Sequence, residues 1–159
     1  IKANTVIGGD GFGYENDDAG FPQKFLHFGS VEIGNNVDIG SNCTIDRGTL
    51  SNTKIGSFVK IDNQVHIGHN CIIGDCSILT PSVTLSGGVI IGKSCWIGPN
   101  ASILQKIKID DNSFIGIGAI VINELKKNDH VIGLPASQPR EIGKISRIGK
   151  NSKIKPKIS

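Results

Sequence analysis

Aliphatic residues recur at every sixth position between residues 55 and 126, in twelve uninterrupted units of six residues. The fifth position of each unit is also small or apolar, and Gly is frequent at the second position. This period does not match the i, i+3, i+4, i+7 spacing of an amphipathic helix. Each unit instead indicates a short strand followed by a turn of Gly, Asn, Asp or Ser. The opening residues are Ile55, Ile61, Ile67, Ile73, Leu79, Leu85, Ile91, Ile97, Ile103, Ile109, Ile115 and Val121.

Units of this size bury an apolar face only when they stack on one another, as the repeats of solenoid proteins do. Three units form an 18-residue coil of triangular section, with the opening residue directed inward and the fifth residue near a corner. Parallel strands stack about 4.8 Å apart, so residues 18 positions apart are predicted to lie one above the other. The sequence therefore predicts an all-β solenoid, in which the uninterrupted block makes four coils.

The repeat extends upstream less regularly. Ile33, Ile39 and Ile45 open three more units, and four additional residues are predicted to loop out near 51–54. Residues of about 13–30 break the repeat with polar and aromatic side chains, and we expect them to form an inserted loop outside the coils. Long insertions of this kind are usually functional or disordered.

We expect one β-helix domain over 1–139 and a short basic tail over 140–159. The tail holds seven Lys and Arg and one acidic residue, Glu141, whereas the preceding residues hold ten basic and thirteen acidic side chains. Such a tail could approach an anionic cofactor, an acidic carrier protein or nucleic acid, or be simply solvated. The coils show no basic stripe with interleaved aromatics, which argues against nucleic-acid binding as the main function.

The composition argues against other classes of protein. No stretch approaches the ~18 apolar residues of a membrane span, and no signal peptide is visible, so we expect a cytoplasmic location.

The four cysteines have no zinc-finger or redox spacing. Cys43, Cys71 and Cys95 take fifth positions of their units and Cys76 a fourth. We expect them to be packed free thiols. The chain does not begin with Met, and we expect it to be a fragment or one domain of a longer protein.

His69 is the candidate for chemistry. It takes the third position of its unit, in a turn, and its ring should point away from the core. Gly87 lies 18 residues later and is predicted to stack over it, whereas Asp62 precedes it on the same coil. A neutral His can take a proton from an amine or hydroxyl nucleophile, a carboxylate can orient the ring, and a Gly N–H can stabilise an oxyanion. The alternative is a solvated His in an exposed turn.

Three motifs carry a resemblance to a known family. They are Gly-Gly-Asp-Gly-Phe-Gly-Tyr at 8–14, Thr-Ile-Asp-Arg-Gly-Thr at 44–49 and Ile-Asp-Asn-Gln-Val-His-Ile-Gly-His-Asn at 61–70. With them, the chain resembles hexapeptide-repeat acyltransferases over about 1–125, and in particular the UDP-3-O-acylglucosamine N-acyltransferase family of lipid A biosynthesis. The resemblance implies a left-handed parallel β-helix, which spacing alone does not predict because strand crossovers are normally right-handed.

The resemblance also implies a role for each candidate residue. His69 matches the base that deprotonates the sugar amine, Asp62 the carboxylate that supports it, and Gly87 the glycine whose N–H faces the thioester carbonyl. The family forms homotrimers with active sites in grooves between neighbouring prisms. It holds no permanently bound cofactor, takes its acyl group from an acyl-CoA or acyl-carrier-protein thioester, and transfers it to a nucleotide-linked amino sugar.

The identity of the acyl donor stays open. At the position of residues 102–107, the lipid A enzymes carry an Asn-Gly-His-like stretch. In this chain the segment is one residue shorter, and the second His of the family is missing. Residues 85–92 and 131–136 resemble instead acetyl-CoA-dependent acetyltransferases of nucleotide-linked amino sugars, in which a Val-x-Gly-x-Pro-Ala segment closes over the CoA arm. This second resemblance places donor contacts at Gly87, Gly88, Gly133, Pro135 and Ala136.

Further residues are predicted to bind the acceptor or to shape the surface. The acceptor contacts are predicted at Phe12, Tyr14, Asn63 and Asn70. Trp96 takes an outward-facing sixth position, where it could stack on adenine or pack at a trimer interface. Asp46 and Arg47 belong to the second motif, and we expect a turn-stabilising contact between them.

Two other function classes remain as alternatives. Zinc-dependent hydration on the same fold would gather histidines from two subunits, but the chain has only His27, His66, His69 and His130. Because His66 and His69 are three residues apart, they could not easily face one site, and no metal site is predicted. A non-catalytic solenoid used for binding is the other alternative, although flat Thr ladders typical of such surfaces are absent from the sequence.

Overall fold

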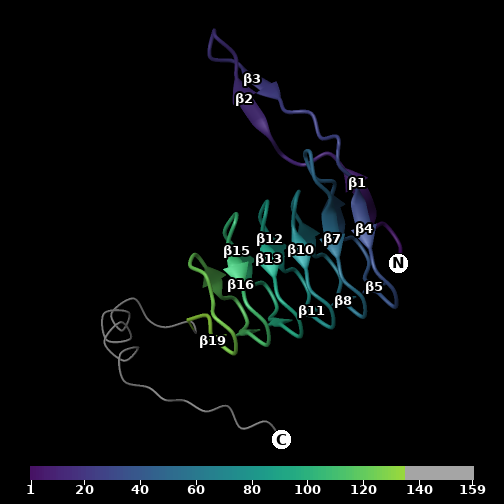
Figure 1. Ribbon diagram of the computed structural model, residues 1–159, viewed down its shortest axis with the longest axis vertical. Coiled ribbons are helices and arrows are strands. Elements are labelled where there is room, and N and C mark those ends of the chain that lie inside the picture. Colours follow the sequence, from purple (N-terminus) through teal and green to yellow (C-terminus); the bar gives the residue numbers. More distant parts are fainter. Residues whose placement is uncertain (135–159) are drawn as a thin grey trace, which may run out of the picture.

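The computed structural model describes residues 1–134, which form a parallel β-helix of about six coils with one projecting β-hairpin (Figure 1). The predicted tail over 140–159, the domain boundary at 139, and the predicted donor contacts Pro135 and Ala136 lie outside the described residues. None of the described segments is a helix long and apolar enough to cross a membrane.

Three parallel sheets form the faces of the prism, and the chain visits them in turn. Face 1 contains β1 (Val6–Gly9), β6 (Thr44–Asp46), β9 (His66–Ile67), β12 (Thr84–Leu85), β15 (Ser102–Ile103) and β18 (Ile120–Val121). Face 2 contains β4 (Val31–Ile33), β7 (Thr53–Ile55), β10 (Ile72–Ile73), β13 (Ile90–Ile91) and β16 (Lys108–Ile109). Face 3 contains β5 (Asp38–Ile39), β8 (Lys60–Ile61), β11 (Ile78–Leu79), β14 (Trp96–Ile97), β17 (Phe114–Ile115) and β19 (His130–Val131). We name each edge of the prism by the two faces that it joins.

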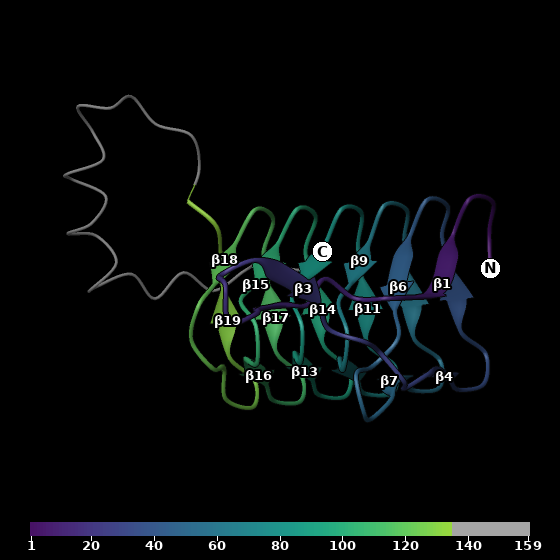
Figure 2. The same cartoon turned by 90° about the horizontal axis from the view of Figure 1, so that it is seen from above.

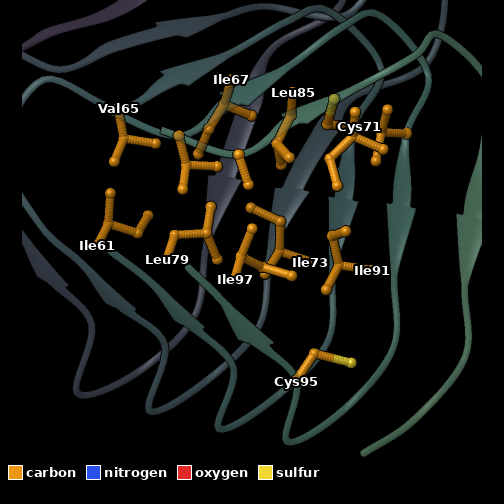
Figure 3. Packing of buried hydrophobic residues seen from close by; sticks show 14 of the residues in the cluster. Ile61, Val65, Ile67, Cys71, Ile73, Leu79, Leu85, Ile91, Cys95 and Ile97 are labelled. Atoms are coloured by element: carbon orange, nitrogen blue, oxygen red, sulfur yellow. The ribbon is translucent and has the colours of Figure 1, made fainter. Parts of the chain in front are cut away.

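The predicted register is confirmed. Residues 18 positions apart pair in the ladders: Ile61 opposes Leu79, which opposes Ile97. All twelve opening residues are buried, and so are the fifth positions except Ile107, which is partly buried. Figure 3 shows labelled members of this column-like core directed toward the prism interior. A strand of two residues is stable here because its neighbours above and below cover it.

The turns share one backbone feature that the period alone did not predict. In every unit that opens between Ile55 and Ile115, the fourth residue has a positive φ, between +55° and +71°. Asn and Gly adopt this left-handed region readily, but Phe58 and Lys106 also do so here. Stacking of the coils therefore imposes one turn conformation on whatever side chain stands at the fourth position.

Both insertions leave the prism at edge 1–2. The first joins β1 to β4 and contains the antiparallel hairpin of β2 (Tyr14–Asn16) and β3 (Pro22–Lys24), which projects from the coils (Figures 1 and 2). The second joins β6 to β7. Its extra residues lie within 47–52, so the predicted position near 51–54 was wrong: Lys54 pairs with Ile72 and already belongs to the ladder.

Candidate active site

His69 follows β9 at edge 1–2, in the turn where the register predicted it, and it is half-buried. Its ring lines a pocket of ≈ 180 Å³ between the coils and the first insertion. Tyr14, Phe25, His27 and Thr49 contribute to the same pocket. Thus each of the two insertions supplies side chains around His69.

The amide of Asn70 fixes the ring of His69. Its Oδ1 accepts a hydrogen bond from the Thr49 N–H (3.1 Å), and its Nδ2 donates to the Ser51 carbonyl (3.3 Å). These backbone partners determine which side of the amide is oxygen. Oδ1 therefore also faces Nδ1 of His69, 2.9 Å away. Because Oδ1 only accepts, Nδ1 carries the hydrogen, and the lone pair of the neutral ring is on Nε2.

The predicted stacking of Gly87 over His69 is confirmed. The Gly88 N–H donates to the His69 carbonyl (2.8 Å), and a Cβ at Gly87 would lie 2.5 Å from Nε2 of His69. Among the hydrogen bonds within residues 1–134, the Gly87 N–H has no acceptor. The site thus brings a lone pair on Nε2 close to an uncommitted backbone donor.

Three of the four predicted acceptor contacts also lie at this edge. Tyr14 lines the pocket, and Phe12 is 87% exposed with its ring centroid 5.0 Å from that of Tyr14. Asn70 lies here as well, although its amide is engaged with Thr49, Ser51 and His69.

Asp62, Asn63 and Gly133 lie at edge 3–1, away from His69. Asp62 accepts a hydrogen bond from the Asn63 N–H (2.7 Å), and Gly133 packs on the last coil next to Ile117. No hydrogen bond joins Asp62 to His69 in the described part of the chain, so the orientation expected from a carboxylate across the turn comes from Asn70 instead. Support by Asp62 across a subunit boundary stays a prediction.

Sequence reasoning considered His27 only as a metal ligand and missed its place beside His69. The ring is 6% exposed, and its centroid lies 5.4 Å from that of His69 in an edge-to-face arrangement. Its Nδ1 donates to the Phe25 carbonyl (2.9 Å), and its buried Nε2 has no partner within residues 1–134. The sequence feature connected with this packing is Gly11. Only a residue without a side chain fits there, because a Cβ would lie 2.8 Å from the His27 ring and 2.9 Å from His69.

The expected contact between Asp46 and Arg47 is not among the contacts of the described residues. Arg47 Nε donates instead to the Gly8 carbonyl (2.7 Å) and lies 3.8 Å from the carboxylate of Asp10. Burial raises the pKa of Asp46, and the nearby imidazoles oppose this effect. Burial also raises the pKa of the Cys71 thiol to about 12, which makes that thiol a poor nucleophile.

Trp96 lies on the outer side of face 3, as predicted, and is 40% exposed. Its ring stacks on Phe114 with centroids 6.5 Å apart and planes 8° from parallel. Within the described residues, no three His, Cys, Asp or Glu side chains are grouped to hold a metal ion.

Known proteins resemble the chain in sequence. The family described as bacterial transferase hexapeptide (six repeats) matches residues 52–87. The UDP-3-O-acylglucosamine N-acyltransferase of Pseudomonas syringae pv. tomato is 49% identical over 83 residues, which are 52% of this chain and 23% of that protein. The enzyme of the same name from Helicobacter pylori is 47% identical over 94 residues, or 59% of this chain and 28% of its own length. The matched segment thus spans about a quarter of each of these curated relatives.

A solved structure resembles the fold over a longer segment. LpxA from Acinetobacter baumannii is 30% identical, has a TM-score of 0.72, and covers 82% of this chain and 49% of its own chain. Its left-handed β-helix matches the handedness implied by the sequence motifs. The chain therefore carries the bacterial transferase hexapeptide repeat on a left-handed parallel β-helix and resembles the UDP-3-O-acylglucosamine N-acyltransferases.

Proposed function

We propose that the chain carries the acyl-transfer site of a sugar N-acyltransferase, which moves an acyl group from a thioester to the amine of a nucleotide-linked amino sugar. The observation that carries this proposal is the pairing of His69 with Gly87. The bond to Asn70 leaves the lone pair on Nε2 of His69, and that atom lies beside the Gly87 backbone. Nε2 is therefore available as a general base close to a potential oxyanion donor.

The reaction needs no covalent intermediate with the enzyme. The amine attacks the thioester carbonyl while Nε2 of His69 takes the proton that the amine loses. The carbonyl oxygen becomes negatively charged in the tetrahedral intermediate, and the Gly87 N–H stabilises it. When the carbon–sulfur bond breaks, the His69 imidazolium returns its proton to the thiolate, which leaves as the thiol. The products are an amide and a free thiol, and His69 is neutral again.

The names of the relatives support an acceptor that is a UDP-linked, 3-O-acylated glucosamine. We propose lipid A synthesis in the cytoplasm as the setting of this reaction. Phe12 and Tyr14 are proposed to contact this acceptor, because Tyr14 lines the pocket that contains His69 and the exposed ring of Phe12 lies 5.0 Å from that of Tyr14. The donor is proposed to be acyl carrier protein or CoA with its acyl group bound at Gly87 and Gly88.

We propose a homotrimer, because the predicted site residues fall on two edges. Edge 1–2 holds His69 and Gly87, whereas edge 3–1 holds Asp62, Asn63 and Gly133. Threefold packing would bring edge 3–1 of one copy against edge 1–2 of the next. Partly exposed apolar side chains on two faces support such packing: Ile72, Ile90, Trp96 and Phe114. Mass measurement in solution by light scattering tests this assembly, and a monomer at working concentration would contradict it.

The donor and acceptor are tested together by mass spectrometry of the reaction products. The full-length protein is incubated with UDP-3-O-acylglucosamine and either 3-hydroxyacyl-carrier protein or acetyl-CoA. With one of the two donor classes, we expect a product that carries the added mass of the acyl group on the sugar nitrogen. Acetylation alone would favour the acetyl-CoA alternative, and no product with either donor on this acceptor or on other UDP- or dTDP-linked amino sugars would contradict the proposal.

Substitution of Gly87 by Ala is expected to lower turnover at least about tenfold. The added methyl group would lie 2.5 Å from Nε2 of His69, so the ring must move. A misplacement of about 1 Å at a catalytic group can cost ~100-fold in rate. The φ of Gly87 is not in the left-handed region, so the backbone tolerates Ala and the melting temperature should change little.

The matched control is Gly9→Ala, at the same edge, where a Cβ would meet its nearest atom at 3.9 Å. Initial rates are compared for the wild type and both variants. Equal rates for Gly87→Ala and Gly9→Ala would show that the Gly87 position is not part of the reaction site.

A further inference from the structure

The second insertion, residues 47–52, closes around the side chain of Asn70. The Asn70 Oδ1 accepts hydrogen bonds from the Thr49 N–H (3.1 Å) and from the Thr49 hydroxyl (3.0 Å). The Asn70 Nδ2 donates to the Ser51 hydroxyl (2.8 Å) and to the Ser51 carbonyl (3.3 Å). A Cβ at Gly48 would overlap the Ser51 carbonyl oxygen and lie 3.0 Å from the Asn70 Nδ2, so this turn needs Gly. The insertion therefore forms a site that holds one amide group.

The backbone of Asn70 is fixed as well. Its N–H donates to Oγ1 of Thr53 (2.9 Å), a fully buried residue of β7. Its φ is +61°, in the left-handed region that Asn adopts more readily than most other residues. Backbone and side chain of Asn70 are thus both held by residues 49–53 of the previous coil, and the amide has one orientation.

This orientation matters because the two ends of an amide are not equivalent. A carboxylate offers oxygen to a neighbouring ring nitrogen in either orientation, whereas an amide offers oxygen in one and NH2 in the other. If the Asn70 Nδ2 faced the ring of His69, Nδ1 would have to accept, and the hydrogen of the neutral ring would be on Nε2. In the Ser-His-Asp proteases, replacement of Asp by Asn produces such a wrong tautomer and lowers kcat ~10⁴-fold. The orientation of the Asn70 amide therefore decides whether Nε2 can take a proton.

We propose that Asn70 is a positioning residue of the reaction that acts through His69. The second insertion holds the Asn70 Oδ1 against Nδ1 of the ring, 2.9 Å away, and thereby keeps the lone pair on Nε2. This inference rests on the proposed acyl transfer and deepens it. It gives Asn70 a role other than the acceptor contact predicted from the sequence, because Thr49, Ser51 and His69 already occupy both ends of the amide. It also assigns a function to the second insertion.

The tautomer of His69 is measured directly, without substrate, by NMR of the two imidazole nitrogens in the full-length protein at a pH where the ring is neutral. Their chemical shifts distinguish the nitrogen that carries hydrogen from the nitrogen that carries the lone pair. We expect hydrogen on Nδ1 in the wild type and a mixture of both tautomers in Asn70→Gly. This variant removes the amide, and Gly tolerates the positive φ. Hydrogen on Nε2 in the wild type, or an unchanged single tautomer in Asn70→Gly, would overturn the inference.

Initial rates give the second readout. We expect kcat of Asn70→Gly to fall at least about tenfold with little change in KM for the acceptor, because part of the molecules lack the lone pair on Nε2 and the ring is no longer held in one orientation. A raised KM at unchanged kcat would show that Asn70 binds the acceptor instead. The matched control is Asn112→Gly at edge 2–3. Asn112 is also an exposed fourth-position Asn, with a φ of +58°, and its variant should keep the wild-type tautomer of His69 and the wild-type rates.

Asn70→Asp tests the inference by rescue. It keeps an oxygen against Nδ1, so it should retain the wild-type tautomer of His69 and a kcat above that of Asn70→Gly. Should Asn70→Gly fail to fold, the tautomer in Asn70→Asp decides, and hydrogen on Nε2 there would contradict the inference. The proposed function fails separately, through full activity of His69→Ala. Loss of activity in His69→Ala together with wild-type kcat in Asn70→Gly would overturn the inference alone.

Discussion

Replacement of His69 by Ala is expected to reduce turnover by at least about 100-fold, the lower end of general-base effects. The imidazole of His69 lies beside Gly87, and the lone pair on its Nε2 is free because the Nδ1 hydrogen is bonded to Asn70. Without it the amine must lose its proton to water. The fold should persist, since the ring is directed away from the core and its loss leaves the ladder pairs of Ile67 intact.

The measurement is the steady-state rate with saturating donor and acceptor, together with the melting temperature and the oligomeric mass. The control is His130→Ala, an exposed His of β19 on face 3, which should keep the wild-type rate. Wild-type turnover of His69→Ala would remove His69 from the mechanism. A fall in rate accompanied by unfolding would show instead that the ring supports the coil.

Replacement of Ile91 by Ala is expected to lower the free energy of unfolding by about 2–5 kcal/mol. Ile91 is 1% exposed and pairs with Ile73 below and Ile109 above. The ladders on three faces hold the coils at fixed spacing, so the walls cannot collapse into the cavity. In a solenoid each repeat contacts only its neighbours, and a cavity in a central coil weakens two interfaces at once.

Chemical unfolding followed by circular dichroism checks this effect. The matched control is Ile120→Ala, on the outer side of β18 and 79% exposed, for which we expect a change below about 0.5 kcal/mol. If the two variants unfolded at the same denaturant concentration, the column of opening residues would not be the source of stability.

The core and the pairing of Gly87 with His69 could be predicted from the sequence because both depend on one short period. Once the unit length is known, each residue has one neighbour above and one below, and Ile67 must lie under Leu85. The handedness could not be derived in this way. It came from the resemblance of three motifs to a family, since a six-residue period fits a coil of either hand.

The surroundings of His69 could not be predicted, because they come from segments outside the period. His27 reaches the site through an insertion whose path no repeat constrains. Thr49 and Ser51 hold Asn70 through a loop whose position was predicted a few residues too late. Local pattern therefore located His69, while tertiary contacts determine its environment.

The shared left-handed residue at the fourth position of the turns has a consequence for how such a scaffold changes. Because each corner has the same backbone path, a segment inserted at one corner leaves the geometry of the others unaltered, as the two insertions at edge 1–2 do. The corners of the prism are in this respect equivalent sites for an insertion. A peptide grafted at the turn of another coil on edge 1–2 would be presented at a chosen height along the prism without redesign of the interior.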